Sequence, residues 1–250
     1  MLTTPHVDGA PNWVELGTPD PEAAAAFYGA LFGWSFQPAG PDSGGYGFFR
    51  LDGLTVAAAG PNPGASAWTL YFQTPDADAT AKAVEECGGA VRVSPFDVFT
   101  SGRMAGCTDP GGAEFALWEP REVRGLDLVA EPGSLAWTEL YVPVPDAIRA
   151  FYAQVFDWTS ENMPFGEMTY IVVSTAEGDD PGLGGVMPLQ EGDTPHWLPY
   201  FEVSDCDEVV ARARELGGRV VAPAVGAEGV GRFAELADPS GARFAVITSA

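Results

Sequence analysis

Hydrophobic and polar positions alternate near the start of the chain. In residues 12–18, NWVELGT, Trp13 and Glu15 fall on one side and Val14 and Leu16 on the other. A period of two residues is that of a β-strand with two different faces. The pattern predicts a strand here, with a tryptophan and a glutamate on the same face.

A helix is predicted directly after this strand. The Asp-Pro-Glu sequence at residues 20–22 supplies an N-cap, a proline whose missing N–H costs nothing in the first turn, and an acidic side chain that the helix dipole favours. Phe27 and Leu31 lie four residues apart and form an apolar stripe, and Gly33 is expected to end the helix.

The same signals predict a second helix and several more strands. The helix spans residues 76–87 and is stopped by two glycines, and Asp-Gly and Asp-Pro-Gly-Gly turns separate the strands that follow. The strands are expected at residues 46–51, 54–59, 68–73, 103–108 and 114–118. The pattern is therefore two successive units, each with one strand, one helix and two or three further strands.

The second half of the chain repeats the first. Trp13 and Trp137 begin long matching stretches and are 124 residues apart. A match of this length indicates an internal duplication. We therefore predict two domains, residues 1–125 and residues 126–250, each composed of two strand–helix–strand units.

The spacing between the two copies changes along the chain. Trp68 and Trp197, which also correspond, are 129 residues apart. The five additional residues of the second copy are expected between Tyr170 and Leu183, at or near residues 177–181, because a loop insertion between intact strands costs little.

The charge of the chain narrows the classes of partner. There are 35 acidic and 12 basic residues, for a formal net charge of −23. Such a surface repels phosphate backbones and anionic lipid headgroups, so neither nucleic acid nor a membrane surface is expected as a partner. A small-molecule ligand is expected instead, and the protein is expected to be a monomer or a homodimer.

Composition and cysteine usage indicate a cytoplasmic protein. Hydrophobic residues make up 46% of the chain, which is enough to fill a core, and no apolar run reaches the ~20 residues that span a bilayer. The N-terminus has no basic region followed by an apolar segment, so no secretory signal is expected. Cys87, Cys107 and Cys206 form no C-x-x-C pair, which is typical of reduced thiols.

Three landmarks resemble a known family. They are Phe27-Tyr28 in the first helix, Gly88-Gly89 after the second, and Asp109-Pro110 in the last turn, and all three return in the second half. In this order they resemble the vicinal oxygen chelate superfamily, which includes glyoxalase I, bleomycin-resistance proteins and extradiol dioxygenases. The resemblance implies an α+β fold, a tandem repeat of paired βαβββ modules in which paired units face each other around a cleft.

The resemblance also identifies where a metal would be held. Enzymes of this superfamily commonly bind a divalent metal with His and Glu side chains from the first and last strands of paired units. The corresponding positions here are Trp13, Trp137, Thr69, Leu198, Ala116 and Ala245, with the remainder in the apolar stretches Val56–Ala59 and Gly185–Met187. None of these is a metal-ligating residue. We therefore predict no metal site and no cofactor.

Two glutamates and one histidine are the candidate catalytic residues. Glu15 and Glu139 lie two residues after Trp13 and Trp137, on the same strand face, where a carboxylate could act as a base or accept a hydrogen bond from a ligand. Alternatively, each forms an ion pair that braces the fold, with Arg50, Arg103 or Arg232 as partner. His196 shares a face with Leu198 and Tyr200 and is either a general base or ligand contact, or a loop histidine.

Aromatic residues are the candidate ligand-binding residues. The predicted set is Trp13, Thr69, Tyr71, Trp137, Leu198 and Tyr200. Flat side chains with a polar group suit a planar ligand, although the same residues could simply fill the core. Trp68 and Trp197 fall on the opposite strand face and are expected to pack against helices. Cys107 has no partner histidine in its half, so it is not expected to be a nucleophile.

These observations favour a glyoxalase- or bleomycin-resistance-like cytoplasmic protein that is metal-free and binds a small apolar or aromatic metabolite. The alternative is an enzyme of the same superfamily, of lyase, isomerase or oxygenase type, that acts by Glu or His proton transfer or with a relocated metal site. A third possibility is that one half binds ligand and the other is scaffold, because Ala67 and Thr69 correspond to His196 and Leu198.

Overall fold

The computed structural model describes residues 2, 6–165, 168–176 and 182–250, and consists of four successive βαβββ motifs. The first is β1 (Pro11–Thr18), α1 (Pro21–Phe32), β2 (Ser35–Pro38), β3 (Gly47–Leu51) and β4 (Leu54–Pro61). The second is β5 (Ala67–Gln73), α2 (Ala77–Glu86), β6 (Ala90–Val98), β7 (Gly102–Thr108) and β8 (Glu114–Pro120). The third is β9 (Leu135–Val142), α3 (Pro145–Phe156), β10 (Thr159–Phe165), β11 (Met168–Ser174) and β12 (Gly182–Pro188). The fourth is β13 (His196–Glu202), α4 (Cys206–Glu215), β14 (Arg219–Ala227), β15 (Gly231–Ala237) and β16 (Arg243–Ser249).

The strands belong to two mixed eight-stranded sheets, β1–β8 and β9–β16. Within each motif the first strand pairs in parallel with the last, as β9 does with β12. The remaining pairs are antiparallel, as β11 is with β12. The predicted α+β class and the tandem repeat of βαβββ motifs are confirmed.

Two strands were not expected from the sequence. β2 and β6 carry mostly exposed side chains, and both lie at the edge of their sheet. The register of β6 also shifts twice against β7, and the strand contains Pro95. Exposure, bulges and proline erase the alternation that a half-buried strand shows.

The local signals for α1 act as predicted. The Asp20 side chain accepts a hydrogen bond of 2.9 Å from the Ala23 amide, and Gly33 adopts a left-handed conformation with φ 76°. The equivalent helix α3 has Val144 as its N-cap residue, with no side-chain hydrogen bond, and Asp157, a non-glycine residue with φ 56°, as its C-cap residue. Because a side-chain cap is worth about 1 kcal/mol, α3 relies more on its buried face.

The chain divides by its contacts into two compact units. Unit 1 comprises Met1–Trp13, Thr69–Gly125 and Trp137–Leu198, and unit 2 comprises Val14–Trp68, Leu126–Ala136 and Pro199–Ala250. Each unit therefore takes one motif from each half of the sequence. The division into residues 1–125 and 126–250 describes the repeat in the sequence and stays a prediction for the domains.

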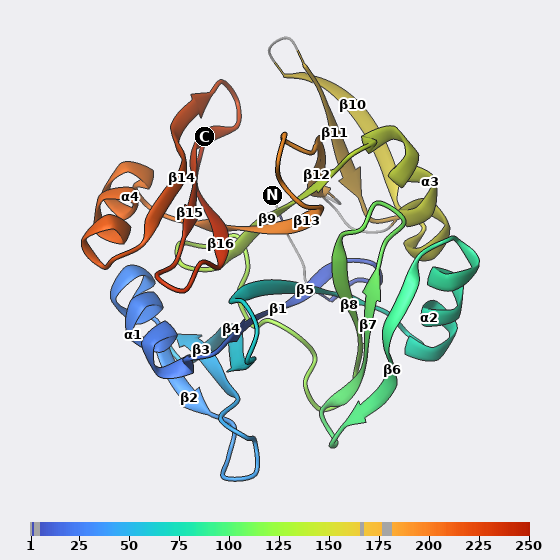
Figure 1. The fold of residues 1–250 in the computed structure, drawn as a ribbon, viewed down its shortest axis with the longest axis horizontal. Helices are drawn as coiled ribbons and strands as arrows, with labels where there is room; N and C mark the ends of the chain where they lie inside the picture. The colour runs from blue at the N-terminus through green and yellow to red at the C-terminus, as the bar shows by residue number, and fades with distance from the viewer. Residues whose placement is uncertain (1, 3–5, 166–167, 177–181) are drawn as a thin grey trace. The chain divides into compact units, whose positions relative to one another are not determined.

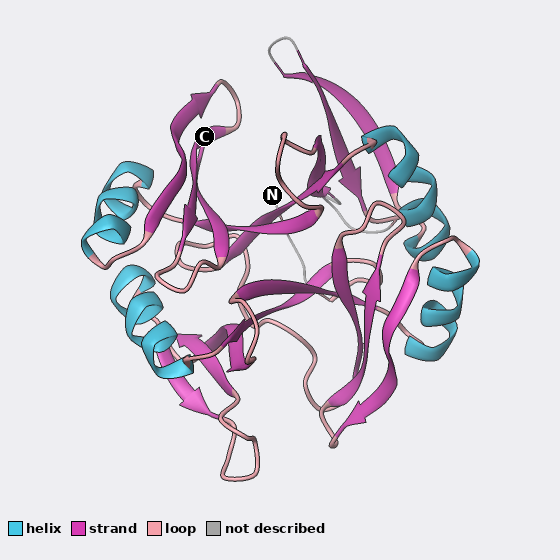
Figure 2. Cartoon of the chain, viewed as in Figure 1, coloured by secondary structure: helices cyan, strands magenta, loops and turns pink. Residues whose placement is uncertain are grey.

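The two helices of each unit lie side by side, α2 with α3 in unit 1 and α1 with α4 in unit 2 (Figure 1). Figure 2 shows the helices of each unit on one face of its strands. None of the helices in the described ranges is long and apolar enough to cross a membrane.

A buried chain of three polar groups lies within unit 1 and draws on the turn after β7, helix α3 and the start of β13. The Trp197 Nε1 donates to the Tyr152 hydroxyl at 3.1 Å, and that hydroxyl donates to Asp109 Oδ2 at 2.9 Å. The other oxygen, Asp109 Oδ1, accepts a hydrogen bond of 3.0 Å from the Ala113 amide, which stabilises the turn between β7 and β8. Burial raises the pKa of Tyr152, which keeps its proton and remains a donor.

Unit 2 contains the same arrangement. Trp68 donates to the Tyr28 hydroxyl at 3.0 Å, and Tyr28 donates to Asp238 at 3.2 Å. We call each set a Trp–Tyr–Asp chain: Trp197–Tyr152–Asp109 and Trp68–Tyr28–Asp238. The prediction that Trp68 and Trp197 pack against helices is confirmed, because each bonds to a helical tyrosine and is at most 7% exposed.

The register of the sheets corrects the predicted position of the insertion. Ala58 pairs with Glu15, and its counterpart Gly185 pairs with Glu139. Ala58 and Gly185 are 127 residues apart, whereas the two glutamates are 124 apart. Three of the five additional residues therefore precede this part of β12, and the other two follow it. The expectation that all five lie before Leu183 is wrong, and residues 177–181 lie outside the described part of the chain.

Candidate functional site

One face of β9 gathers the polar and aromatic groups that the sequence singled out. Trp137, Glu139 and Tyr141 alternate along the strand and so share a face. The hydroxyl of Tyr170, on β11, donates to Glu139 Oε1 at 2.8 Å and accepts from Trp137 Nε1 at 2.9 Å. The Tyr141 hydroxyl donates to the other carboxylate oxygen. Glu139 is thus bound by two tyrosines and is only 7% exposed.

A glycine makes room for one of these tyrosines. A Cβ atom at Gly185, on β12, would collide with the ring and hydroxyl of Tyr170. Burial first, and then the neighbouring carboxylate of Glu139, raise the pKa of Tyr170 well above its usual value. Tyr170 therefore keeps its proton and acts as a donor to Glu139.

His196 adjoins this face. Its ring stacks on Tyr141 with 4.9 Å between centroids and 10° between planes. Its Nδ1 lies 2.8 Å from the carbonyl oxygen of Thr194, which can only accept, so Nδ1 carries the hydrogen. The carboxylate of Asp193 is 4.0 Å from the same nitrogen. The other nitrogen, Nε2, is buried and has no hydrogen-bond partner among the described residues.

The corresponding face of β1 is simpler. The Tyr46 hydroxyl donates to Glu15 Oε2 at 2.9 Å, as Tyr170 does to Glu139. Gly17 stands in place of Tyr141, and Ala67 stands in place of His196. The β1 face therefore has the tyrosine–glutamate contact but not the stacked tyrosine and histidine.

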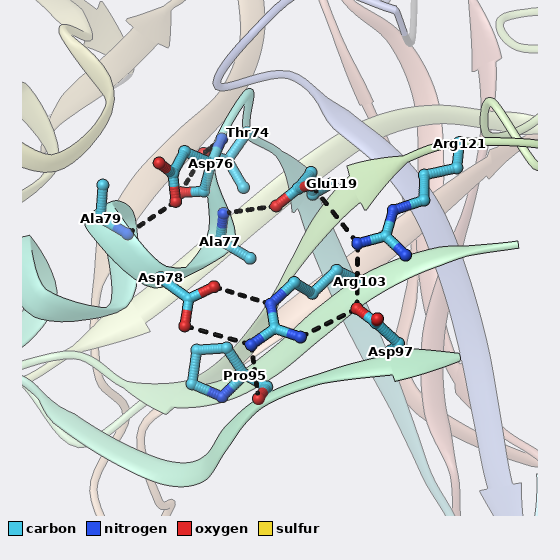
Figure 3. Close-up of polar contacts among 10 residues, drawn as sticks. All are labelled: Thr74, Asp76, Ala77, Asp78, Ala79, Pro95, Asp97, Arg103, Glu119 and Arg121. Atoms are coloured by element: carbon cyan, nitrogen blue, oxygen red, sulfur yellow. Dashed lines mark hydrogen bonds and ion pairs between the residues drawn. The ribbon is translucent and has the colours of Figure 1, made fainter. Parts of the chain in front are cut away.

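The arginines proposed as partners of the two glutamates bind aspartates. Arg103, on β7, forms a two-point contact with Asp78 of α2 and a 2.8 Å contact with Asp97 of β6 (Figure 3). Arg232 makes the same two-point contact with Asp207. These ion pairs fasten a strand to a helix at the surface and leave the glutamates to their tyrosine donors.

The predicted ligand-binding residues are distributed over both units. Unit 1 contains Trp13, Thr69, Tyr71, Trp137 and Leu198, whereas unit 2 contains Tyr200. Leu198 is fully buried, and Trp13, Tyr71 and Tyr200 are 5–6% exposed. Tyr200 packs near Phe233, with ring centroids 6.3 Å apart. That this set binds a ligand stays a prediction.

The residues present do not fit a metal ion. The positions at which the superfamily holds metal carry carbon-rich side chains, as where Ala116 faces Tyr71 and Ala245 faces Tyr200 across parallel strands. Within the described ranges, no group of three or more His, Cys, Asp or Glu residues is arranged to hold a metal. The donor set therefore gives no basis for a metal-dependent step.

Tyr141 and Tyr170 are the residues that sequence reasoning missed. Tyr170 served only to align the two halves, and Tyr141 was not noticed. The signal was present, because Trp-x-Glu-x-Tyr continues the alternation of β9 by one more position. The corresponding position of β1 is Gly17, so a comparison of the two copies does not identify Tyr141 as a shared residue.

The buried thiol does not add a nucleophile. Cys107 is fully buried, and this burial raises its pKa to about 12. A thiol with so high a pKa carries almost no thiolate at neutral pH, which is compatible with the prediction that Cys107 is not a nucleophile.

Comparison with known proteins agrees with this architecture. The model of the glyoxalase-like domain matches residues 13–118 and 137–247. The chain is 38% identical over 252 residues to "Putative glyoxylase CFP32" of Mycobacterium tuberculosis, covering 97% of this chain and 95% of that protein. It is 39% identical over 264 residues to "Anthracycline biosynthesis protein DnrV" of Streptomyces peucetius, covering 98% and 94%.

Solved structures share the fold at low sequence identity. The 2,2',3-trihydroxybiphenyl 1,2-dioxygenase of Sphingomonas wittichii has a TM-score of 0.68 at 13% identity, covering 97% of this chain and 91% of the other. The Mn(II)-bound glyoxalase of Novosphingobium aromaticivorans has a TM-score of 0.64 at 17% identity, covering 96% and 82%. The chain therefore belongs to the glyoxalase-like domain family of the vicinal oxygen chelate superfamily, with two modules in tandem.

Proposed function

We propose that the protein binds a small, largely apolar or aromatic metabolite on the β9 face of unit 1. One observation carries the proposal: the ring of Tyr141 donates to the carboxylate of Glu139 and stacks on His196, and Trp137 lies on the same strand face. Flat rings give a planar ligand a large contact area, and a few placed polar groups fix its orientation.

The surrounding chemistry supports binding rather than metal-assisted catalysis. Donor residues are missing from the positions where the superfamily holds its metal, whereas both oxygens of Glu139 are already held by tyrosine hydroxyls. A carboxylate fixed in this way is oriented in advance, which lowers the entropy cost of binding. The name of DnrV, which refers to anthracycline biosynthesis, is compatible with a small-molecule ligand. We place this activity in the cytoplasm.

Proton transfer by the same groups is the second candidate. Glu139 and His196 both contact Tyr141, so a substrate seated there would meet a carboxylate and an imidazole together. Either group is a chemically suitable general base. This candidate predicts turnover, whereas the binding proposal needs only a stable complex.

Tryptophan fluorescence tests the proposal. A panel of planar hydroxylated and unsubstituted aromatic compounds would be titrated into the protein, with mass spectrometry of the mixture to detect turnover. We expect saturable quenching that is strongly reduced in Trp137→Phe and retained in Trp13→Phe, the matched change on β1. If both variants keep the quenching of the natural protein, the β9 face is not the site. If no compound of the panel quenches the fluorescence, the proposed function is wrong.

Metal analysis separates the classes further. Protein purified without chelator is expected to contain no stoichiometric transition metal. Stoichiometric metal with binding or turnover lost on chelation would overturn the metal-free proposal.

A further inference from the structure

His196 Nε2 is a polar atom whose state the fold leaves unexplained. Because Nδ1 donates to the Thr194 carbonyl, Nε2 is the nitrogen that carries the lone pair whenever the ring is neutral. It is buried without a partner in the described structure. A buried acceptor left without a donor is unfavourable, and such atoms in native proteins call for an explanation.

The ring itself is held in place by its neighbours. The stacking contact with Tyr141 and the bond to Thr194 fix both the plane and the tautomer of the imidazole. The side chain as a whole is 20% exposed, whereas Nε2 itself is buried, so a ligand reaches Nε2 only when a neighbouring side chain moves aside. A fixed acceptor beside an aromatic face suits a ligand contact in which the ligand supplies the missing donor.

We propose that His196 Nε2 accepts a hydrogen bond from a hydroxyl group of the ligand, and that the ligand is therefore a hydroxylated aromatic compound, a phenol or an enol. This inference rests on the proposed function and specifies the substrate class of the same site. The ligand's ring lies against the Tyr141–His196 stack and its hydroxyl points to Nε2. A ligand without this hydroxyl leaves the nitrogen unpaired and binds more weakly.

The proposed hydroxyl-binding site occurs in only one of the two repeats. Ala67 and Gly17 take the places of His196 and Tyr141 in the first half, so the first half supplies neither the acceptor nor the stacked ring. One hydroxylated ligand per chain is therefore expected, with the first half serving as scaffold for this contact.

Nuclear magnetic resonance can observe the contact directly, because the chain contains only two histidines. Protein labelled with ¹⁵N-histidine would be titrated at pH 7.5 with 2-naphthol and, separately, with 2-methoxynaphthalene. The ether replaces the hydroxyl hydrogen with a methyl group, so its oxygen can accept a hydrogen bond but cannot donate one. His6→Ala assigns the signals without touching the site. We expect 2-naphthol to shift the Nε2 resonance of His196 and to bind about 10-fold more tightly than its ether, as one hydrogen bond contributes.

Two variants test the origin of that preference. His196→Ala, which restores the residue of the first half, should bind both probes with equal affinity. His196→Gln, whose amide oxygen also accepts, should keep part of the preference, and it serves if the alanine variant does not fold. An unchanged Nε2 signal at saturation, or a preference that survives in His196→Ala, overturns the inference.

The outcomes also separate this inference from the proposed function. If the two probes bind equally well to the natural protein, the function stands and the hydroxyl contact is wrong. If neither probe binds, the hydroxyl contact is again wrong, whereas the function is judged by the wider panel of aromatic compounds.

Discussion

The β1 and β9 faces are corresponding copies that share some groups and differ in others. Both keep a tryptophan, a glutamate and a tyrosine that donates to that glutamate. Only the β9 face adds Tyr141 and the stacked His196, where the β1 face has Gly17 and Ala67. The shared groups are common to both strand faces, whereas the added rings are those of the proposed ligand site.

The Trp–Tyr–Asp chains show the opposite behaviour. Tyr152 and Asp109 in unit 1 match Tyr28 and Asp238 in unit 2, contact for contact. Both aspartates are at most 4% exposed, and loss of the tyrosine hydroxyl would leave a buried carboxylate with one donor fewer. Positions of this kind tolerate little change, so the duplication preserved them.

The largest expected effect is on these shared chains. Tyr152→Phe and Tyr28→Phe should each lower the free energy of unfolding by about 2 kcal/mol, because each removes a buried bond to a carboxyl group. Burial raises the pKa of Asp109 and Asp238, while the tyrosine bond lowers it. The folded state of each variant therefore favours the protonated acid more strongly, and the loss should grow as pH rises.

Urea unfolding at several pH values measures this effect. The two variants serve as controls for each other, since the contacts match. A loss in one unit without a comparable loss in the other would show that the two chains are not equivalent.

A smaller effect is expected where the two faces differ. Gly185→Ala should lower the free energy of unfolding by about 1–1.5 kcal/mol, because the new methyl group displaces the ring of Tyr170 from Glu139. The matched change is Ala58→Gly opposite Glu15, which removes a methyl group and should cost about 0.5–1 kcal/mol. Denaturant unfolding compares the two. A larger cost for the Ala58 variant would contradict the role assigned to Gly185.

The smallest effect concerns the surface ion pairs. Arg103 contacts Asp78 and Asp97, whereas Arg232 contacts only Asp207 among the interactions described for it. Hydrogen bonds from Arg103 and Arg232 lower the pKa of these acids below the usual value. An acid whose pKa is lower in the folded protein stabilises the fold at any pH above its pKa in the unfolded chain. That stabilisation is lost as the pH falls through its pKa in the folded protein.

Thermal unfolding of Arg103→Met and Arg232→Met can test this ranking. At pH 7 the melting temperature should fall slightly in both, and more for Arg103→Met. As the pH falls through the lowered pKa values of the folded aspartates, both differences from the natural protein should shrink. A difference that grew at acid pH would rule out the ion pairs as its cause.

The sequence predicted the repeated elements well because half-buried strands and capped helices leave periodic signals. It did not predict β2 or β6, whose edge positions expose both faces. Nor did it reveal that Tyr28 and Asp238, both recognised as landmarks, touch each other, because pattern within a strand or helix says nothing about which distant motif it meets. The face shared by Trp137 and Glu139 followed from alternation alone, whereas the stack of Tyr141 on His196 depends on neighbouring strands.

The two Trp–Tyr–Asp chains also set the order in which the two units can fold while the polypeptide is being synthesised. In unit 1 the tyrosine follows its aspartate by only 43 positions, whereas in unit 2 the two are separated by 210. Unit 1 can form its buried bond as soon as the middle of the polypeptide has emerged. Unit 2 must wait for nearly the last residues to be translated, so α1 and the strands after it remain without their partner motif for most of elongation.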